Sequence, residues 1–206
     1  MEAARPRPLL DLDDLLEEIC LVLQLTPTLY ENARTKYEAI AGWLTAPGSK
    51  LLPYAPLIFP QGSFRIQTTV RPWRHDEYDL DLVCHLAIPL GLQVDPMWVY
   101  GLVEERLAAN ETYRTRLERY KRCLRIVYAG NFHLDLTPAR PDPSGVPNHL
   151  VVPDRKLKAW KPSDPRGFAK WFNVRTLAGR RGRRCGRRPP STTATAQTRD
   201  SPFWRE

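Results

Sequence analysis

The sequence predicts a domain of mixed helices and strands, of the α/β (α+β) class. Helices are indicated where a capping residue precedes proline, at 26–27 (Thr-Pro) and 95–96 (Asp-Pro), each ahead of apolar residues at helical spacing. Strands are indicated at 77–86 and 132–138, where apolar and polar residues alternate with a period of two. We therefore expect both kinds of element in one domain.

The composition fits a globular protein and argues against several other classes. With 206 residues and 42% apolar residues, the chain is long enough for one good-sized domain, or one domain and part of another. No apolar run approaches the roughly 18 residues that span a bilayer, and the acidic N-terminal segment lacks the apolar region of a signal peptide. The four cysteines form no CxxC pair, which argues against a zinc site or a disulfide framework. We expect a cytoplasmic protein with no membrane partner.

The positive charge is concentrated at the C-terminal end. The net charge is +8, and residues 175–206 contribute +7 of it, with nine arginines against one aspartate and one glutamate. Because this segment has no regular period and almost no aliphatic residues, we expect a basic, low-complexity and disordered tail. The core domain, residues 1–174, is nearly neutral, which argues against direct nucleic-acid binding. An incidental tail is favoured over a nucleic-acid arm, since it begins suddenly and its basic residues are not interleaved with aromatic ones.

The same patterns predict an order of elements. Both N-terminal helices have apolar residues at helical spacing, and we expect them to pack through these faces. The segment 138–165 is rich in proline and is expected to wrap the surface. The predicted elements are a helix over 9–25, a helix from 26–27 to Pro47, a strand at 57–59, a strand at 77–86, a helix from 95–96 through Leu107 that can continue into 111–120, a hairpin of 123–129 and 132–138 with Gly130-Asn131 as its turn, and a short helix capped by Ser163.

Asp79 and Asp81 are the first candidates for chemistry. They stand two positions apart on a predicted strand, so their side chains leave the same face, opposite to Leu80. Two carboxylates so close repel unless a cation lies between them, and all-oxygen ligation favours Mg²⁺ or Mn²⁺. Asp135, which alternates with apolar residues on its own strand, could add a third carboxylate and complete a two-metal site for phosphoryl or nucleotidyl transfer.

The segment between the two strands offers groups that could bind a triphosphate. Gly62, placed after a strand, lets backbone N–H groups approach phosphate closely, and the Ser63 hydroxyl adds a donor. The candidate set is Gln61, Gly62, Ser63, Arg65 and Thr68, with Thr69, Arg71 and Arg74 as further donors or cations in the same loop.

Each pattern has a structural alternative when it is taken alone. A Gly-Ser pair is more often a turn, a DxD pair can be the polar face of an edge strand, and Asp135 could face solvent on a hairpin. For His133, on the face of Asp135, a polar strand residue with a satisfied hydrogen bond is favoured over a metal ligand. Their joint occurrence favours a catalytic site.

Three motifs resemble one family. QGSFRIQTTVRP, EYDLDLVC and FHLDLTPA are similar to segments of the CD-NTases, the bacterial relatives of cyclic GMP–AMP synthase that act in CBASS anti-phage defence. VVPDRKLKAWKPSDPRGFAKWF also resembles a later segment of these proteins, so the resemblance covers residues 10–173. It implies a polymerase-β-like nucleotidyltransferase fold, a mixed sheet flanked by helices.

The resemblance also implies an activity. Such enzymes bind two Mg²⁺ ions and join nucleoside triphosphates, ATP, GTP or others, into cyclic oligonucleotides that activate a downstream effector. By the same resemblance, Gly62 and Ser63 would hold the triphosphate. Asp79 and Asp81 would ligate both metals, and Asp135 would complete the site and help to deprotonate the attacking hydroxyl.

The resemblance ends after Asn173. Family members continue with a helical lobe that closes over the nucleotides, whereas here the Arg-rich tail follows, so we expect a truncated or frameshifted chain that turns over poorly. Two alternatives stay open. One is a nucleotidyltransferase that acts on RNA or a protein hydroxyl, and the other is a catalytically silent nucleotide-binding module.

Overall fold

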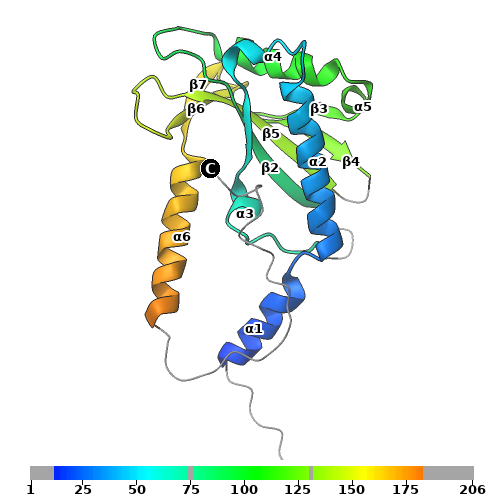
Figure 1. Cartoon of the computed structure of the whole chain (residues 1–206), viewed down its shortest axis with the longest axis vertical. Coiled ribbons are helices and arrows are strands. Elements are labelled where there is room, and N and C mark those ends of the chain that lie inside the picture. Colours follow the sequence, from blue (N-terminus) through cyan, green and yellow to red (C-terminus); the bar gives the residue numbers. More distant parts are fainter. Residues whose placement is uncertain (1–11, 74–76, 130–131, 183–206) are drawn as a thin grey trace, which may run out of the picture. The chain divides into compact units, whose positions relative to one another are not determined.

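The computed structural model describes residues 12–73, 77–129 and 132–182, whose helices and strands are shown in Figure 1. The chain divides into two compact units, 1–173 and 174–206, and every strand of the described part belongs to the first. The elements are α1 (Leu12–Leu23), α2 (Pro27–Thr45), a 3₁₀ turn (Leu52–Tyr54), β1 (Leu57–Pro60), α3 (Gly62–Arg65), β2 (Tyr78–His85), α4 (Pro96–Ala108), α5 (Glu111–Arg114), β3 (Leu117–Arg119), β4 (Leu124–Tyr128), β5 (Phe132–Pro141), β6 (Leu150–Asp154), β7 (Ala159–Ser163) and α6 (Pro165–Gly182).

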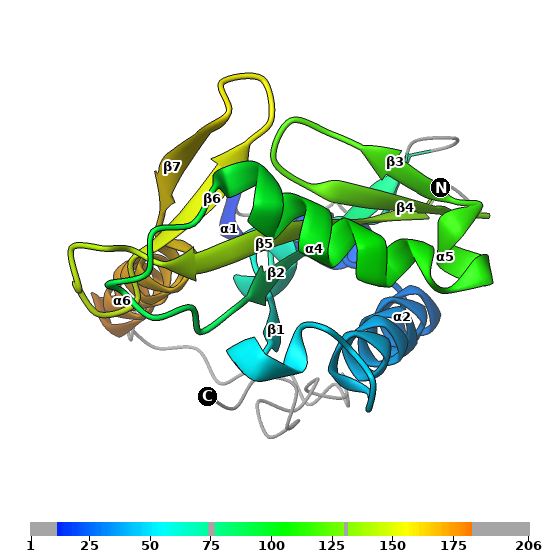
Figure 2. The ribbon, with the colours of Figure 1, turned by 90° about the horizontal axis from the view of Figure 1, so that it is seen from above.

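A mixed sheet of seven strands forms the centre of the first unit. Its main path runs β1-β2-β5-β4-β3, and β6 pairs with both β5 and β7. The central pair, β2 and β5, is parallel, while all other pairs in the described part are antiparallel. Figure 2 shows β2 and β5 at the centre, with the helices α2 and α4 beside them. The predicted mixed sheet flanked by helices is confirmed.

One face of the central strands is apolar and buried. Leu80 and Leu82 of β2 and Leu134 of β5 are completely buried. On the same face, the hydroxyl of Tyr78 donates a hydrogen bond of 3.5 Å to the carbonyl of Leu29 in α2. The α4 helix, whose inner residues are also buried, borders β5 and β6. Because residues alternate along a strand, Asp79, Asp81 and Asp135 all leave the opposite face.

The predicted starts of the two packed helices are confirmed. The Thr26 hydroxyl accepts the N–H of Leu29 at 3.3 Å, and the Asp95 carboxylate accepts the N–H of Met97 at 2.6 Å. In each case proline follows the cap, as the sequence indicated. These caps satisfy donors that the first helical turn leaves without an internal partner.

Two predictions about helices are wrong. The α1 helix forms where it was expected, but none of its residues is buried, so it does not pack into the core. The helix after 95–96 ends at Ala108 and does not continue through 111–120. Asn110 accepts the N–H groups of Thr112 and Tyr113 and begins the separate turn α5, after which the chain enters β3.

The proline-rich segment 138–165 does not wrap the surface as predicted. It completes β5 and forms the hairpin of β6 and β7, and all five residues of β6 are buried. Pro153 pairs with Trp160 of β7 but has no partner on β5, because β6 meets β5 only through Leu150 and Val151.

The chain after β7 also differs from the prediction. The side chain that accepts an N–H in the first turn of α6 is that of Asp164, bonded to Gly167 at 2.7 Å, and not that of Ser163. The α6 helix runs to Gly182, beyond the predicted boundary at 174. The rest of the predicted disordered tail, 183–206, and the predicted turn at 130–131 lie outside the described residues.

Candidate active site

Three of the predicted site residues meet on the polar face of the central strands. In the parallel register of β2 and β5, Asp81 lies directly beside Asp135, and Asp79 lies beside His133. Neighbouring strands are about 4.8 Å apart, so the carboxylates of one row are within direct electrostatic range. The structure therefore brings together the acids that alternation alone had placed on two separate strands.

The Asp81 carboxyl is the most perturbed acid of this group. Its pKa is raised to about 6, first because burial disfavours the charged form and then because Asp79 and Asp135 repel it. His133 and Arg125 act in the opposite direction and lower this pKa. The net effect shows an excess of negative charge that the surrounding side chains only partly neutralise.

Gly62 touches this carboxylate. Its backbone has φ +60°, and a Cβ at this position would lie 2.5 Å from Oδ2 of Asp81. The neighbouring Gln61 N–H donates to the Asp81 carbonyl at 2.9 Å, which fixes the loop to β2. Only glycine meets both the left-handed backbone and the close approach. The predicted Gly-Ser segment and the predicted acids are therefore adjacent.

The rest of the predicted loop is held around Ser63. Its hydroxyl accepts the Thr69 hydroxyl at 3.0 Å, and its carbonyl accepts the Thr68 N–H at 2.9 Å. The Gln61 amide reaches Thr137 on β5 at 3.4 Å. Among the predicted basic residues, Arg65 ends α3, the backbone of Arg71 bonds to Leu23, and Arg74 lies outside the described residues.

Arg125 of β4 is the main residue that the sequence did not predict. Its Nε and Nη2 donate to the two oxygens of Asp135 at 2.7 and 2.8 Å, a bidentate ion pair. The predicted two-residue turn would have set Ile126 opposite Asp135. The strands instead pair Tyr128 with Phe132, a register that places Arg125 there. This register depends on how many residues connect β4 with β5, and the sequence did not reveal that number.

His133 has the structural role that the sequence favoured. Its Nδ1 lies 2.8 Å from Oε2 of Glu77, so the imidazole has a hydrogen-bond partner just ahead of β2. Glu77 itself had not been singled out. It extends the row of acids formed by Asp79 and Asp81 by one more alternate position.

The acids suit a hard divalent cation in kind but are not assembled around one. Carboxylate oxygens are the ligands that Mg²⁺ and Mn²⁺ prefer, and a cation would relieve the repulsion that raises the pKa of Asp81. Within residues 12–73, 77–129 and 132–182, however, no group of three or more histidine, cysteine, aspartate or glutamate side chains is arranged to hold a metal ion. Both oxygens of Asp135 are instead engaged by Arg125.

Comparison with known proteins places this geometry in a family. Residues 56–138, which contain every predicted site residue, match the family described as "Cyclic GMP-AMP synthase DncV-like, nucleotidyltransferase domain". The chain is 37% identical over 163 residues to the c-di-GMP synthase of Roseivirga ehrenbergii, and 34% identical over 173 residues to the cyclic dinucleotide synthase CdnG of Bradyrhizobium diazoefficiens. Residues 56–138 therefore match the nucleotidyltransferase domain of the CD-NTases.

The similarity covers most of this chain but less than half of its curated relatives. The two matches include 78% and 80% of the chain, and 43% and 40% of the relatives. The solved structure of the Bradyrhizobium CdnG in complex with GTP superposes with a TM-score of 0.68 at 30% identity, over 82% of this chain and 48% of that one.

A more distant CD-NTase shares the fold. The structure of Escherichia coli DncV in a 3′-deoxy GTP bound form has a TM-score of 0.61 at 17% identity, and it covers 82% of this chain and 60% of that one. The polymerase-β-like nucleotidyltransferase fold that the resemblance implied is therefore confirmed. The described domain therefore shares the nucleotidyltransferase fold of these proteins.

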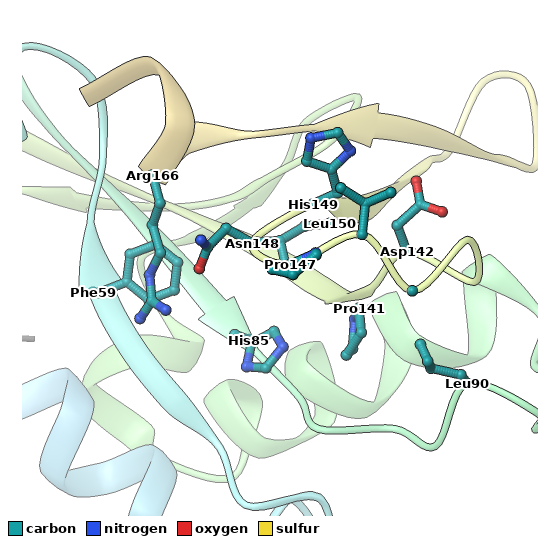
Figure 3. Close-up of a pocket in the computed structure, with 12 residues that line it drawn as sticks. Phe59, His85, Leu90, Pro141, Asp142, Pro147, Asn148, His149, Leu150 and Arg166 are labelled. Carbon is teal, nitrogen blue, oxygen red and sulfur yellow. The ribbon is translucent and has the colours of Figure 1, made fainter. Parts of the chain in front are cut away.

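The cavity shown in Figure 3 lies at the other end of the central strand. It has a volume of about 340 Å³ and includes His85, the last residue of β2, but no predicted site residue. The Arg166 guanidinium stacks on the Phe59 ring at 4.4 Å, and burial, together with Arg166, lowers the pKa of His85.

In the described part of the chain, no helix is both long and apolar enough to cross a bilayer.

Proposed function

We propose that this chain carries the catalytic centre of a Mg²⁺-dependent synthase of cyclic oligonucleotides, acting on nucleoside triphosphates. The observation that carries the proposal is the meeting of Asp81, Asp135 and Gly62, three groups from three separate motifs, at one place on the sheet. The similarity to a c-di-GMP synthase and to a cyclic dinucleotide synthase supports the product class.

The proposal extends to the substrate and the biological role. The CdnG neighbour was solved in complex with GTP, which supports purine nucleoside triphosphates as substrates. We propose that the product activates a separate effector in CBASS anti-phage defence, in the bacterial cytoplasm. An enzyme of this kind needs no direct contact with nucleic acid or with its effector.

The residues divide the work by their chemistry. Asp79 and Asp81 would hold Mg²⁺ or Mn²⁺, which when bound supplies positive charge against the charge that develops on the α-phosphate. The loop at Gly62 and Ser63 would bind the triphosphate through its N–H and hydroxyl groups. Because it stands beside Asp81, Asp135 would complete the metal site and help to deprotonate the attacking ribose hydroxyl.

The proposed transfer needs no covalent enzyme intermediate. The ribose oxygen forms a bond to the α-phosphorus, the bond from that phosphorus to the bridging oxygen breaks, and pyrophosphate leaves. A second transfer of the same kind closes the ring. The buried Cys84 thiol, whose pKa is raised to about 12 by desolvation, is unsuited to act as a nucleophile.

The test measures products and binding together. The purified chain is incubated with α-labelled ATP, GTP, CTP and UTP and with Mg²⁺ or Mn²⁺, and the products are treated with phosphatase and separated. We expect phosphatase-resistant label from the chain itself, and at least about a thousandfold less from Asp79→Asn/Asp81→Asn. Glu31→Gln/Glu38→Gln, which removes two exposed acids of α2, is the matched control and should not change the yield.

Calorimetry with non-hydrolysable GTP and ATP analogues in Mn²⁺ completes the test. Binding that depends on Asp79 and Asp81, without turnover, would restrict the proposal to a nucleotide-binding module. Label transferred to RNA or protein instead of a small product would show the other kind of nucleotidyltransferase. Neither binding nor product in any condition would refute the proposal.

A further inference from the structure

The ion pair between Arg125 and Asp135 is unusually complete for a catalytic carboxylate. Both oxygens of Asp135 accept hydrogen bonds from one guanidinium, at 2.7 and 2.8 Å. The two side chains are 21% and 12% exposed, so little water competes for them. A planar guanidinium that meets a carboxylate with two parallel bonds forms one of the stronger ion pairs in proteins.

The guanidinium is held in place from a second side. It lies 4.3 Å from the centre of the Tyr120 ring, and its Nη1 donates to the Tyr120 hydroxyl at 3.3 Å. The pairing of β4 with β5 sets Arg125 and Asp135 directly opposite each other. The contact is therefore built into the sheet, and it does not depend on the rotamer of a long surface side chain alone.

We propose that Arg125 is a positioning residue that occupies Asp135 while the site is free, in direct competition with the metal ion. The inference rests on the proposed function, because it treats Asp135 as a metal ligand. In the chain without nucleotide, Asp79 and Asp81 then provide the ligands, and Asp135 takes part only when Arg125 releases it. The absence of a three-ligand cluster within the described residues agrees with this arrangement.

A purely structural ion pair makes a different prediction. If Arg125 only holds β4 to β5, its removal should loosen the site and weaken metal binding. If Arg125 competes with the metal, its removal frees a third carboxylate and should strengthen metal binding. The two roles therefore predict opposite changes in metal affinity when Arg125 is removed.

The experiment is a Mn²⁺ titration of the nucleotide-free chain by calorimetry, checked by the electron paramagnetic resonance signal of unbound Mn²⁺. Arg125→Gln is expected to bind Mn²⁺ at least about tenfold more tightly than the natural chain, equivalent to about 1.4 kcal/mol. Asp135→Asn alone should change the affinity less than about threefold, and in the Arg125→Gln background it should cancel the gain.

Arg116→Gln is the matched control. This arginine lies on the same hairpin and stacks near the Tyr128 ring at 5.7 Å, so its loss removes an equal charge and a similar aromatic contact. It should leave Mn²⁺ affinity unchanged. Thermal unfolding verifies that every variant is folded. If Arg125→Gln is not folded, Arg125→Lys is used in its place. Its gain in Mn²⁺ affinity should be smaller, and its ammonium group cannot bind both oxygens of Asp135 in parallel.

The outcomes separate the two proposals. Unchanged or weaker Mn²⁺ binding by Arg125→Gln, with binding by the natural chain that Asp79→Asn/Asp81→Asn abolishes, overturns the competition and leaves the proposed function standing. Equal gains in Arg125→Gln and Arg116→Gln also overturn it, because net charge alone would then explain them. Binding of Mn²⁺ by no variant overturns both the inference and the metal-dependent function.

Discussion

Two aspartates of this domain, the fully buried Asp154 at the end of β6 and the half-buried Asp81 in β2, have opposite surroundings. The Asp154 carboxylate accepts the N–H groups of Lys156 and Leu157, both at 3.1 Å, and lies 3.3 Å from the Lys121 amine. Desolvation acts to raise the pKa of Asp154, but these hydrogen bonds and charges outweigh it and hold the pKa below its usual value.

Asp81 has carboxylates where Asp154 has donors. Burial and then Asp79 and Asp135 raise the pKa of Asp81, so the folded chain disfavours its charged form. The difference separates an acid that the fold satisfies from one that fits the proposed metal site. Hydrogen bonds and positive charges stabilise the Asp154 carboxylate, whereas the repulsion at Asp81 is relieved by a proton and would be relieved by a bound cation.

The largest effect is expected when the structural acid is removed. Asp154→Asn at pH 7 should lower the midpoint of thermal unfolding by at least about 10 °C, because it removes a completely buried carboxylate charge that accepts two backbone N–H groups and pairs with Lys121. Asp142→Asn is the control, since Asp142 is only partly buried and accepts the Ser144 N–H at 2.7 Å. If the midpoint of thermal unfolding falls no further in Asp154→Asn than in Asp142→Asn, the contrast between Asp154 and Asp81 does not hold.

The pH dependence of this loss has a defined sign. The pKa of Asp154 is lowered in the folded chain, so its contribution is present above the unfolded pKa and is lost as pH falls through the folded one. The natural chain and Asp154→Asn should therefore differ most near neutral pH and converge in acid. Scans of thermal unfolding across pH measure this.

Removal of the Asp81 charge should have the opposite effect on stability. In chelator at pH 8, Asp81→Asn should raise the free energy of unfolding by about 2 kcal/mol, because it removes a buried charge that its neighbours repel. A carboxyl whose folded pKa is raised stabilises the fold below the unfolded pKa, near 4, and loses this contribution as pH rises through about 6. The gain should vanish near pH 4.

Denaturant unfolding at both pH values measures the difference. Asp79→Asn is a useful companion, since it removes a neighbour that repels Asp81 and should recover part of the gain. A loss of stability on Asp81→Asn at pH 8 would show that Asp81, like Asp154, is completed by the fold. The distinction between the two acids would then fail.

The sequence predicted the acids better than their partners. Alternation with a period of two is enough to place Asp79, Asp81 and Asp135 on polar faces, and parallel pairing then brings them together. The cap signals at 26–27 and 95–96 were equally local and equally reliable. Features that one stretch of backbone determines are visible in one stretch of sequence.

The features that were missed depend on pairing between strands. Arg125 meets Asp135 only because the connection after Tyr128 sets that register, and one residue fewer would bring another side chain there. Asp154 lies in the segment VVPDRK, whose proline and charged residues do not suggest a strand, although all five residues of β6 are buried. Nothing in the local period shows that Lys121, far away in the chain, supplies its countercharge.

The last comparison is between a glycine of the site and a glycine of the scaffold. Gly62→Ala should cost about 1–3 kcal/mol in the free energy of unfolding, because alanine is strained at φ +60° and its Cβ would clash with Asp81. Gly42→Ala, in the last turn of α2 with nothing within 4 Å of the added Cβ, should instead gain about 0.5–1 kcal/mol. Denaturant unfolding measures both, and calorimetry with a GTP analogue should show weaker binding for Gly62→Ala alone. Because both substitutions add the same methyl group, equal effects would mean that the close approach of Gly62 to Asp81 imposes no constraint of its own.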